Sequence, residues 1–390
     1  MHFMRVALII ERVEAWRGGA ETSTIQFAQR AVERGCEVTL VTTSRGVPPP
    51  GLSLLTIRAA AALRAQRTLL FARRAAAAVA KEGFDIVHAI TPCAAADVYE
   101  PRGGAVPEML RRNVALRRSA LHRSVKRFRD KLNLKYRVLR RVERALVLRR
   151  PPPIVIAISG YVARQFQEHY GLGPPHVRVI FNGVDPDTAT AAERAADDNE
   201  IRQQYDLGRH ERLLLCVAHN FRLKGVARLI EAVAALPATH RRYARVVIVG
   251  RDNPVPYARL ADRLGVEDRI VFAGSTERIA AFYHAADMLV HPTYYDPCSR
   301  VVLEALCAGV PVITTRFNGA AEAMTDGREG FILDTPDDVA ALSDRIARLL
   351  DEPFRERCAA AALRLREELG MDRHADEIVK LYREIHEVRS

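Results

Sequence analysis

Two carboxylates eight positions apart lie at the start of a predicted helix, and both could accept hydrogen bonds from hydroxyl groups. Asp296 lies in a loop after an apolar run, and Glu304 lies in the helix that opens near Ser299. The unpaired N–H groups and the dipole of a helix start favour an anion. The amides expected to bind that anion belong to Cys298, Ser299, Arg300 and Val301. This combination predicts a site for a phosphorylated, hydroxyl-rich ligand.

The segments around these residues alternate in the pattern of a doubly wound α/β fold. Residues 288–290 and 310–315 are apolar runs predicted as buried strands on either side of the helix. Near the amino end, a strand at 4–10, a helix ending at Gly35 and a strand at 38–42 repeat this order. A chain of 390 residues usually divides into two domains. We therefore predict two Rossmann-like α/β domains.

The segment from Asp296 to Val312 resembles the E-x7-E segment of the retaining, nucleotide-sugar-dependent glycosyltransferases of family 4. The likeness continues in Gly18-Gly19-Ala-Glu, in Asn182-Gly183-Val-Asp and in Lys224-Gly225. Within the family, the sequence is most similar to the glucosyltransferases of bacterial lipopolysaccharide core. The resemblance implies the GT-B architecture, in which two Rossmann-like domains face each other and the last helix returns to the first domain.

The resemblance also implies where the domains begin and end. Residues 1–176 would form an acceptor-side domain with a basic helical insertion at 105–150. Residues 177–370 would form the domain that binds the nucleotide sugar, and 371–390 would be the helix that packs back on the first domain.

The same resemblance implies roles for individual residues at the donor site. Glu304 would bind the ribose and Asp296 the transferred sugar, while Lys224 would hold the diphosphate as negative charge builds on it. The flexible backbone of Gly18 and Gly19 would approach the donor from the first domain. The sequence departs from the family pattern at three positions, which are Asp296 in place of Glu, Arg300 in the loop, and Arg222 as the arginine of the lysine turn.

A second group of candidates follows a predicted central strand at 84–90. Ligands of open α/β sheets bind beyond the carboxyl ends of the strands, so this strand and the loop after it face a binding region. The acceptor candidates are His88, Asp97, Arg102 and Gly103. The apolar strand pattern around His88 favours a core or strand-end histidine over a binding role, and Arg102 is equally consistent with a solvated loop arginine.

Cysteine usage and hydropathy limit the classes of protein to consider. The six cysteines show no C-x-x-C and no Cys/His spacing, which predicts reduced thiols in the cytoplasm and no zinc site. No apolar run is long enough to cross a bilayer, and residues 1–11 are too short and strand-like for a signal peptide. Asp185-Pro-Asp187 matches the D-x-D pattern, but because it lies in the Asn-Gly-Val-Asp turn we expect no metal there. We predict no cofactor, with the nucleotide sugar as a substrate.

One segment makes the chain basic. Residues 111–150 hold sixteen Lys and Arg residues and two acids, a net charge of +14 against +12 for the whole chain. Apolar residues recur every three or four positions from 121 to 146, which predicts one helix or a broken pair of helices across 117–148. Either a membrane-binding surface or a solvated helix face would fit this pattern. The basic residues chosen as membrane candidates are Arg117, Arg118, Lys126, Arg127, Arg140 and Arg141.

Together these features predict a retaining, metal-independent glycosyltransferase. Its donor would be UDP-glucose, and its acceptor a membrane-associated glycolipid or polysaccharide such as lipopolysaccharide core. The enzyme would be cytoplasmic and bound peripherally to the anionic inner membrane. A nucleotide-sugar epimerase or a donor-binding protein of the same fold is one alternative. A nucleic-acid-binding protein is another, but the paired carboxylates and the scarcity of aromatic residues in the basic segment disfavour nucleic acid.

Overall fold

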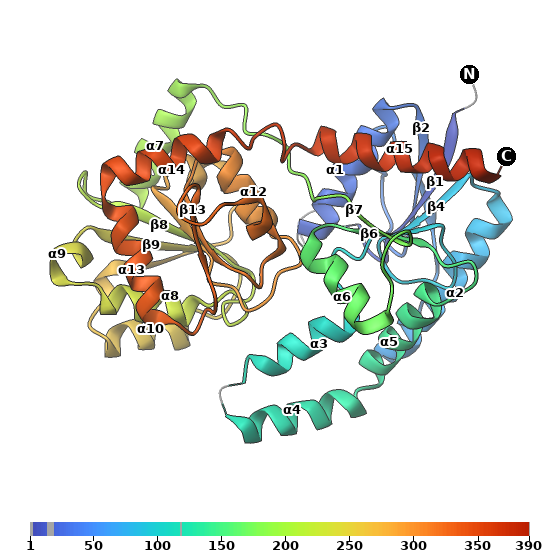
Figure 1. The fold of residues 1–390 in the computed structure, drawn as a ribbon, viewed down its shortest axis with the longest axis horizontal. Coiled ribbons are helices and arrows are strands. Elements are labelled where there is room, and N and C mark those ends of the chain that lie inside the picture. The colour runs from blue at the N-terminus through green and yellow to red at the C-terminus, as the bar shows by residue number, and fades with distance from the viewer. Residues whose placement is uncertain (1–2, 14–18, 118, 390) are drawn as a thin grey trace. The chain divides into compact units, whose positions relative to one another are not determined.

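The computed structural model describes residues 3–13, 19–117 and 119–389, and within them the chain forms two compact units. Unit 1 comprises residues 1–183 and 371–390, and unit 2 comprises 184–370. Each contains a sheet in which every strand pair is parallel, flanked by helices (Figure 1). The prediction of two doubly wound α/β domains is confirmed.

In unit 1 the strand order is β3-β2-β1-β4-β5-β6-β7. Strand β1 pairs with β2 on one side and with β4 on the other, so the chain changes direction across the sheet between β1 and β4. The elements are β1 (Met4–Ile9), α1 (Gly19–Glu33), β2 (Cys36–Thr42), β3 (Ser53–Thr56), α2 (Arg64–Glu82), β4 (Ile86–Ala89), β5 (Val98–Tyr99), α3 (Val106–Ala115), α4 (Ala120–Leu132), α5 (Leu134–Val147), β6 (Ile154–Ala157), α6 (Gly160–Tyr170), β7 (Val177–Val179) and α15 (Met371–Arg389).

The last helix of the chain, α15, completes the core of unit 1. Its residues Met371, Ile378 and Tyr382 are buried in one apolar cluster with residues of α1, β1, β2 and β4. Phe27 of α1 contacts the Tyr382 ring edge-on, at 6.4 Å between ring centres. Unit 1 is therefore built from two segments of sequence that are separated by the whole of unit 2.

The predicted domain boundary at 177 differs from the structure. Strand β7 pairs with β6 and thereby extends the sheet of unit 1, so the division falls between Gly183 and Val184. The basic segment forms the predicted broken pair of helices, because α4 ends and α5 begins at Asn133. The backbone of Asn133 is extended, and its side chain accepts a hydrogen bond from the Tyr136 amide, which caps α5.

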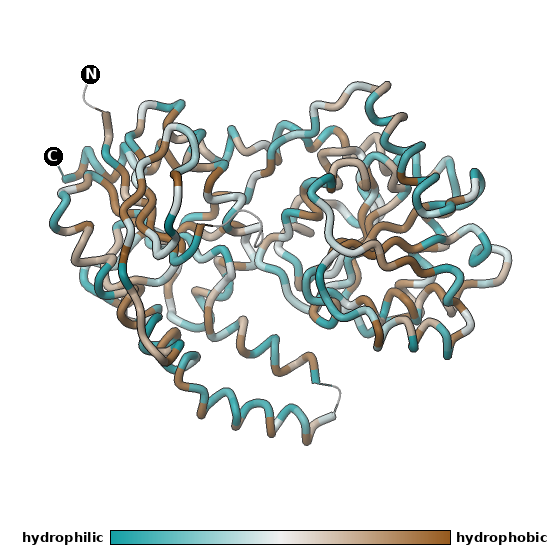
Figure 2. The backbone as a smooth tube through the Cα atoms, turned by 180° about the vertical axis from the view of Figure 1, so that it is seen from behind, coloured by the Kyte–Doolittle hydropathy of each residue, from teal (hydrophilic) through white to brown (hydrophobic). Residues whose placement is uncertain are grey.

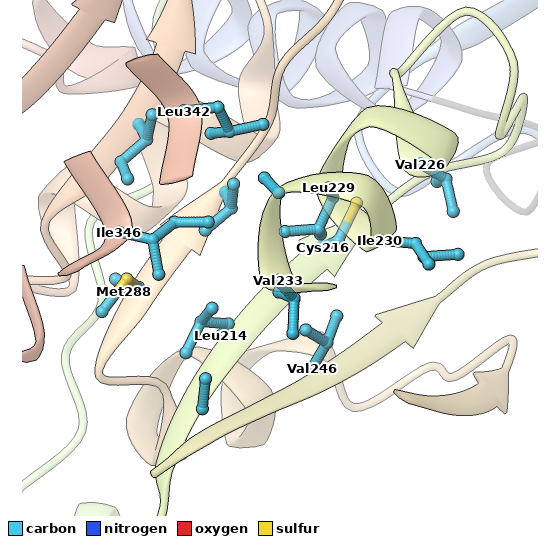
Figure 3. Packing of buried hydrophobic residues seen from close by; sticks show 14 of the residues in the cluster. Leu214, Cys216, Val226, Leu229, Ile230, Val233, Val246, Met288, Leu342 and Ile346 are labelled. Atoms are coloured by element: carbon cyan, nitrogen blue, oxygen red, sulfur yellow. The ribbon is translucent and has the colours of Figure 1, made fainter. Parts of the chain in front are cut away.

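In unit 2 the strand order is β10-β9-β8-β11-β12-β13. Helices α8 and α13 bury Val226, Leu229, Leu342 and Ile346 against apolar residues of the strands (Figure 3). The elements are α7 (Ala191–Gln204), β8 (Arg212–Val217), α8 (Val226–Ala235), α9 (Ala238–Arg241), β9 (Ala244–Val249), α10 (Val255–Arg263), η2 (Glu267–Arg269), β10 (Ile270–Gly274), α11 (Ile279–Ala285), β11 (Met288–Val290), α12 (Arg300–Cys307), β12 (Val312–Thr315), η3 (Gly319–Ala323), β13 (Gly330–Leu333), α13 (Val339–Leu350) and α14 (Glu352–Leu363).

Candidate functional site

The candidate donor site lies where the sheet of unit 2 changes direction. From β8 the chain proceeds to β9 and β10 on one side, whereas β11, β12 and β13 extend the other side. The turn at 218–225 follows β8 and the loop at 291–299 follows β11, and β8 and β11 are paired neighbours. Both loops therefore leave the same edge of the sheet, which is the common position of ligand sites in this fold class.

Close backbone contacts hold these two loops together. The Tyr294 amide donates to the Leu223 carbonyl at 2.9 Å, and the Thr293 hydroxyl donates to the same carbonyl at 3.2 Å. Gly225 has φ +74°, and a Cβ atom at this position would lie 2.1 Å from the carbonyl oxygen of Pro292. Only glycine fits this approach, so it fixes the position of the lysine that precedes it.

Lys224 and Asp296 form an ion pair at the centre of the site. The Lys224 Nζ atom lies 2.5 Å from the Asp296 Oδ2 atom, and the two side chains are 17% and 15% exposed. The backbone of Asp296 is held by hydrogen bonds with Phe317 and Gly319. Burial alone would raise the pKa of Asp296, but the positive charge of Lys224 outweighs burial and holds this pKa well below its usual range.

Sequence reasoning missed His291, which lies beneath this pair. It is fully buried, and neither ring nitrogen has a hydrogen-bond partner among the described residues. Its Nε2 atom is 3.9 Å from the Asp296 carboxylate, too far for a hydrogen bond. Burial and the nearby Lys224 charge lower the pKa of His291, so the ring is neutral at pH 7.

Glu304 is held by one partner on each carboxylate oxygen. The Tyr283 hydroxyl donates to Oε2 at 2.9 Å, and the Arg300 guanidinium donates to Oε1 at 3.1 Å. The Glu304 side chain remains one quarter exposed. Arg300 is thus the partner of Glu304 one turn earlier on α12.

The Ser299 amide, which was expected to bind an anion, already has a partner in the protein. The Ser299 amide donates to the Asn318 Oδ1 atom at 3.1 Å, and the Ala320 amide donates to the same oxygen at the same distance. The prediction for Ser299 is therefore wrong as regards its amide. Cys298 and Val301 flank it, and Arg222 is exposed in the turn that carries Lys224.

His88 and Glu100 form the centre of a buried polar network in unit 1. Both side chains are fully buried, and the His88 Nε2 atom lies 3.3 Å from Glu100. The other His88 nitrogen contacts the Tyr382 hydroxyl at 2.5 Å, which connects the network to α15. Burial lowers the pKa of His88. For Glu100 burial acts to raise the pKa, but Arg102 and His88 outweigh it and lower this pKa to about 2. His88 is therefore a core residue of unit 1.

Arg102 and Gly103 line a pocket of about 590 Å³ in unit 1. The pocket lies beyond the carboxyl ends of β1, β4 and β5, where that sheet changes direction. Ala20 and Glu21, which follow Gly19 in the first turn of α1, also line it, whereas Gly18 lies outside the described residues. The lining also includes four basic residues that sequence reasoning did not assign to a site, Arg12, Arg64, Arg67 and Lys135.

Asp97 does not belong to this pocket. It precedes β5, and its carboxylate accepts hydrogen bonds from the Val87 amide at 2.8 Å and from Arg389 of α15 at 2.6 Å. It therefore lies at the amino end of β5, opposite the pocket edge. The expectation that Asp97 faces a binding region is wrong. Strand β5 begins directly after Asp97, so the loop that reaches the pocket starts only at the other end of this strand.

The D-x-D sequence has a structural role at its second acid. The Asp187 carboxylate contacts the His284 Nε2 atom at 3.0 Å and also pairs with Arg194. Among the described residues, no group of three or more His, Cys, Asp or Glu side chains could hold a metal ion.

The basic segment holds the six membrane candidates on and beside α4 and α5. Arg127, Arg140 and Arg141 are exposed, whereas Lys126 pairs with Asp130 at 2.5 Å. Arg117 follows α3 and is half-buried. Arg118 lies outside the described residues. No described helix is both long enough and apolar enough to span a membrane.

Two family models match successive parts of the chain. Residues 17–188 match the model "Glycosyltransferase Family 4", and residues 197–365 match "Glycosyl transferases group 1". The chain is 31% identical over 228 residues to the lipopolysaccharide glucosyltransferase WaaG of Escherichia coli K12, over 58% of this chain and 61% of that protein. It is 33% identical over 243 residues to a D-inositol 3-phosphate glycosyltransferase of Nocardiopsis dassonvillei, over 59% of this chain and 55% of that protein.

The fold is similar to a solved structure over nearly its whole length. The crystal structure of WaaG, a glycosyltransferase involved in lipopolysaccharide biosynthesis, matches with a TM-score of 0.81 and 25% identity, covering 97% of this chain and 99% of that one. In sequence, by contrast, the chain spans less than two thirds of the length of the curated relatives it matches.

Proposed function

We propose that this chain, which belongs to the family 4 glycosyltransferases, transfers a hexose from a nucleotide sugar to a glycan acceptor. The observation that carries the proposal is the Lys224–Asp296 pair at the direction change of the unit 2 sheet, with Glu304 on the adjoining helix. A nucleotide sugar contains a diphosphate with a ribose on one side and the transferred sugar on the other. The cation of Lys224 suits the diphosphate, and the carboxylates of Asp296 and Glu304 suit the hydroxyl groups of the two sugars.

Each group has a separate task in this proposal. Glu304, fixed by Tyr283 and Arg300, accepts hydrogen bonds from the ribose of the donor. Asp296, kept ionised by its lowered pKa, accepts hydrogen bonds from the transferred sugar. Lys224 donates to the diphosphate, and its charge stabilises the leaving group more strongly as the sugar–phosphate bond breaks.

Transfer proceeds with retention in this proposal. The acceptor oxygen attacks the anomeric carbon from the face that the diphosphate leaves, and the acceptor proton passes to the departing phosphate oxygen. Asp296 does not serve as a nucleophile in this proposal, because its carboxylate binds hydroxyl groups of the transferred sugar. Since Lys224 supplies the compensating charge, we expect no divalent metal in the reaction. The donor we propose is UDP-glucose and the acceptor a lipopolysaccharide core glycan, since WaaG carries the name of a lipopolysaccharide glucosyltransferase.

The experiment combines a donor screen with analysis of the product. The purified chain is incubated with UDP-glucose, UDP-galactose or GDP-mannose and a core oligosaccharide acceptor, with and without EDTA. We expect an α-linked glucose product by NMR, unchanged by EDTA, and no epimerised donor. A β-linked product would overturn retention, and activity lost with EDTA and restored by Mg²⁺ would overturn metal independence. If the donor is epimerised and no sugar is transferred, the chain is an epimerase and the transferase proposal is wrong.

The same proposal includes docking of the basic helices on an anionic membrane. No residue of α4 is buried, and Figure 2 shows hydrophobic and hydrophilic positions alternating along this helix, which projects from the rest of unit 1. The exposed apolar side chains recur at helical spacing: Leu121 (73% exposed), Val125 (49%), Phe128 (63%) and Leu132 (61%). An apolar stripe without a protein partner fits insertion into the lipid interface.

Basic residues on both sides of the apolar stripe support an anionic membrane as the surface that it contacts. At 100° per residue, Arg129 and Lys131 fall on opposite flanks of the stripe, and both are exposed. Long basic side chains in this position bury their stems and keep their charges among lipid headgroups. Each contributes about 1 kcal/mol near an anionic surface. The second half of the predicted stripe is not available, because Val142 and Leu146 are buried in unit 1.

Flotation with vesicles tests the docking. We expect binding to vesicles with anionic lipid, weaker binding as salt rises, and loss of binding in the double variant Leu121→Ser, Phe128→Ser. The matched control is Val255→Ser, which replaces a half-exposed apolar residue of unit 2 and should bind like the native chain. Equal binding to neutral vesicles, or full binding by the double variant, would contradict the proposal.

A further inference from the structure

The pocket of unit 1 contains more positive charge than its own acids neutralise. Its lining includes five basic side chains from four separate parts of the chain and two acidic ones. The basic residues are Arg12 after β1, Arg64 and Arg67 on α2, Arg102 after β5 and Lys135 on α5. Converging cations repel one another, so an anion in the pocket would relieve the repulsion.

Four of these cations have no partner within the described structure. The side chains of Arg12, Arg64, Arg67 and Lys135 form no ion pair or hydrogen bond with any described residue. Most other arginines of the chain pair with an acid or a carbonyl, as Arg34 does with Asp372 and Asp376. The pocket therefore leaves its donors available for a ligand.

The start of α2 adds to the excess of positive charge in the pocket. Arg64 and Arg67 lie in or beside its first turn, where the helix dipole favours negative charge, yet the turn contains no acid. The preceding residue, Leu63, provides no side-chain cap for the free amides. Two arginines in this place are unfavourable without an anion.

Arg102 is oriented before any ligand arrives. Its side chain is 4% exposed, and its guanidinium donates to the fully buried Glu100 at 2.9 Å. Glu100 is in turn contacted by His88, which contacts Tyr382. Glu11 and Glu21 are the acids of the pocket, and their carboxylates suit sugar hydroxyls. The volume of about 590 Å³ lies within the usual range for small-molecule sites.

We propose that this pocket binds an anionic sugar of the acceptor, through a phosphate or carboxylate group held by Arg12, Arg64, Arg67 and Lys135. The inference rests on the proposed transferase function for the identity of the ligand as acceptor. The oxyanion lies among the unpaired cations, and Glu11 and Glu21 bind neighbouring hydroxyls. The enzyme would thereby prefer charged acceptors to neutral sugars of the same size.

Isothermal titration of the full chain tests this with three probes: glucose 6-phosphate, glucuronate and methyl glucoside. Saturating UDP is present so that the probe anion cannot occupy the donor site. We expect one or both anionic sugars to bind at least tenfold more tightly than methyl glucoside, and more weakly at high salt. Binding of glucose 6-phosphate alone would identify a phosphate as the recognised group, and binding of glucuronate alone a carboxylate.

Matched variants locate the site. Arg67→Gln and Arg12→Gln should each weaken binding of the anionic sugar about ten- to a hundredfold, the usual effect of losing a hydrogen bond to a charged group. Arg73→Gln, at an exposed position of α2 outside the pocket, should bind like the native chain. The proposal would be overturned if Arg73→Gln weakened binding of the anionic sugar as much as Arg67→Gln does. It would also be overturned if methyl glucoside bound as tightly as the anionic sugars.

A parallel titration with UDP-glucose separates this inference from the proposed function. If UDP-glucose binds and no anionic sugar does, the anion site is overturned while the transferase proposal stands. If an anionic sugar binds through Arg67 and UDP-glucose does not, the donor site fails and the anion site stands. In transfer assays the Arg67→Gln variant should raise KM for the acceptor and leave KM for the donor unchanged.

Discussion

Replacing Lys224 by methionine should destabilise unit 2 as well as abolish most transfer. Methionine keeps the length of the side chain but removes its charge, which leaves the Asp296 carboxylate without its closest partner. Removing one member of a buried ion pair costs about 3–5 kcal/mol. Because the Lys224 and Asp296 side chains are 17% and 15% exposed, the lower end applies. A loss of ~3 kcal/mol corresponds to a fall in Tm of roughly 6–12 °C for a unit of this size.

The pH dependence of this loss gives a second measurement. In the native chain the pKa of Asp296 is lowered on folding, so its stabilisation is present above the unfolded pKa of about 3.9 and disappears as the pH falls below it. In Lys224→Met the burial effect dominates, so the folded pKa of Asp296 rises above the unfolded value. The variant therefore gains stability, relative to the native chain, as the pH falls from 7 towards 4. Calorimetry across this range should show the two Tm values converge.

The double variant Lys224→Met, Asp296→Asn distinguishes the structural effect from the catalytic one. It contains no unpaired buried charge, so most of the lost stability should return. Transfer should not return, because kcat falls by about 10²–10³ when a donor to a developing anion is removed. A Tm of Lys224→Met within 2 °C of the native value, or a double variant as unstable as the single one, would refute the reasoning.

The remaining predictions concern Glu304 and the lysine turn. Glu304→Ala should raise KM for the donor about tenfold or more with a small change in kcat, because the ribose contact exists equally in the ground and transition states; a fall in kcat alone would contradict the ribose assignment. Gly225→Ala should lower the stability of unit 2 by ~2 kcal/mol or more, because its Cβ atom would meet the carbonyl oxygen of Pro292 at 2.1 Å. Gly265→Ala is its control in chemical denaturation, since φ there is also positive, at +66°, but no atom lies within 4 Å of the added carbon; equal losses in both variants would show that only the backbone angle matters.

Much of the donor site could be predicted because sequence position determines which end of a parallel strand a loop leaves. Lys224 and Asp296 follow strands β8 and β11, and paired parallel strands deliver both residues to one edge. The partners of these residues could not be predicted in this way. Asn318, which follows β12, accepts a hydrogen bond from the Ser299 amide. Tyr283 donates a hydrogen bond to Glu304 from α11, a helix earlier in the chain.

Two features of the structure were not predicted from the sequence, and only the first has a local sequence pattern. The acidic, alanine-rich segment 193–200 lies in helix α7, which was not among the elements predicted from the sequence. Thr190 and Glu193 form a capping box that starts this helix, and the T-x-x-E spacing could have identified it. The cationic pocket had no such local pattern, because Arg12, Arg67 and Lys135 come from distant segments that only the folded sheet brings together.

The division of unit 1 into two segments affects how the chain can fold during its synthesis. Met371, Ile378 and Tyr382 fill the core of unit 1, but the ribosome releases them only after residues 184–370. At about 5–20 residues per second, the first 183 residues wait roughly 10–40 s for the helix that completes them. Unit 2 can complete its fold before unit 1 does, although it is synthesised after most of unit 1. Until α15 arrives, Phe27 and His88 lack their Tyr382 partner, so this part of the core of unit 1 stays incomplete during that interval.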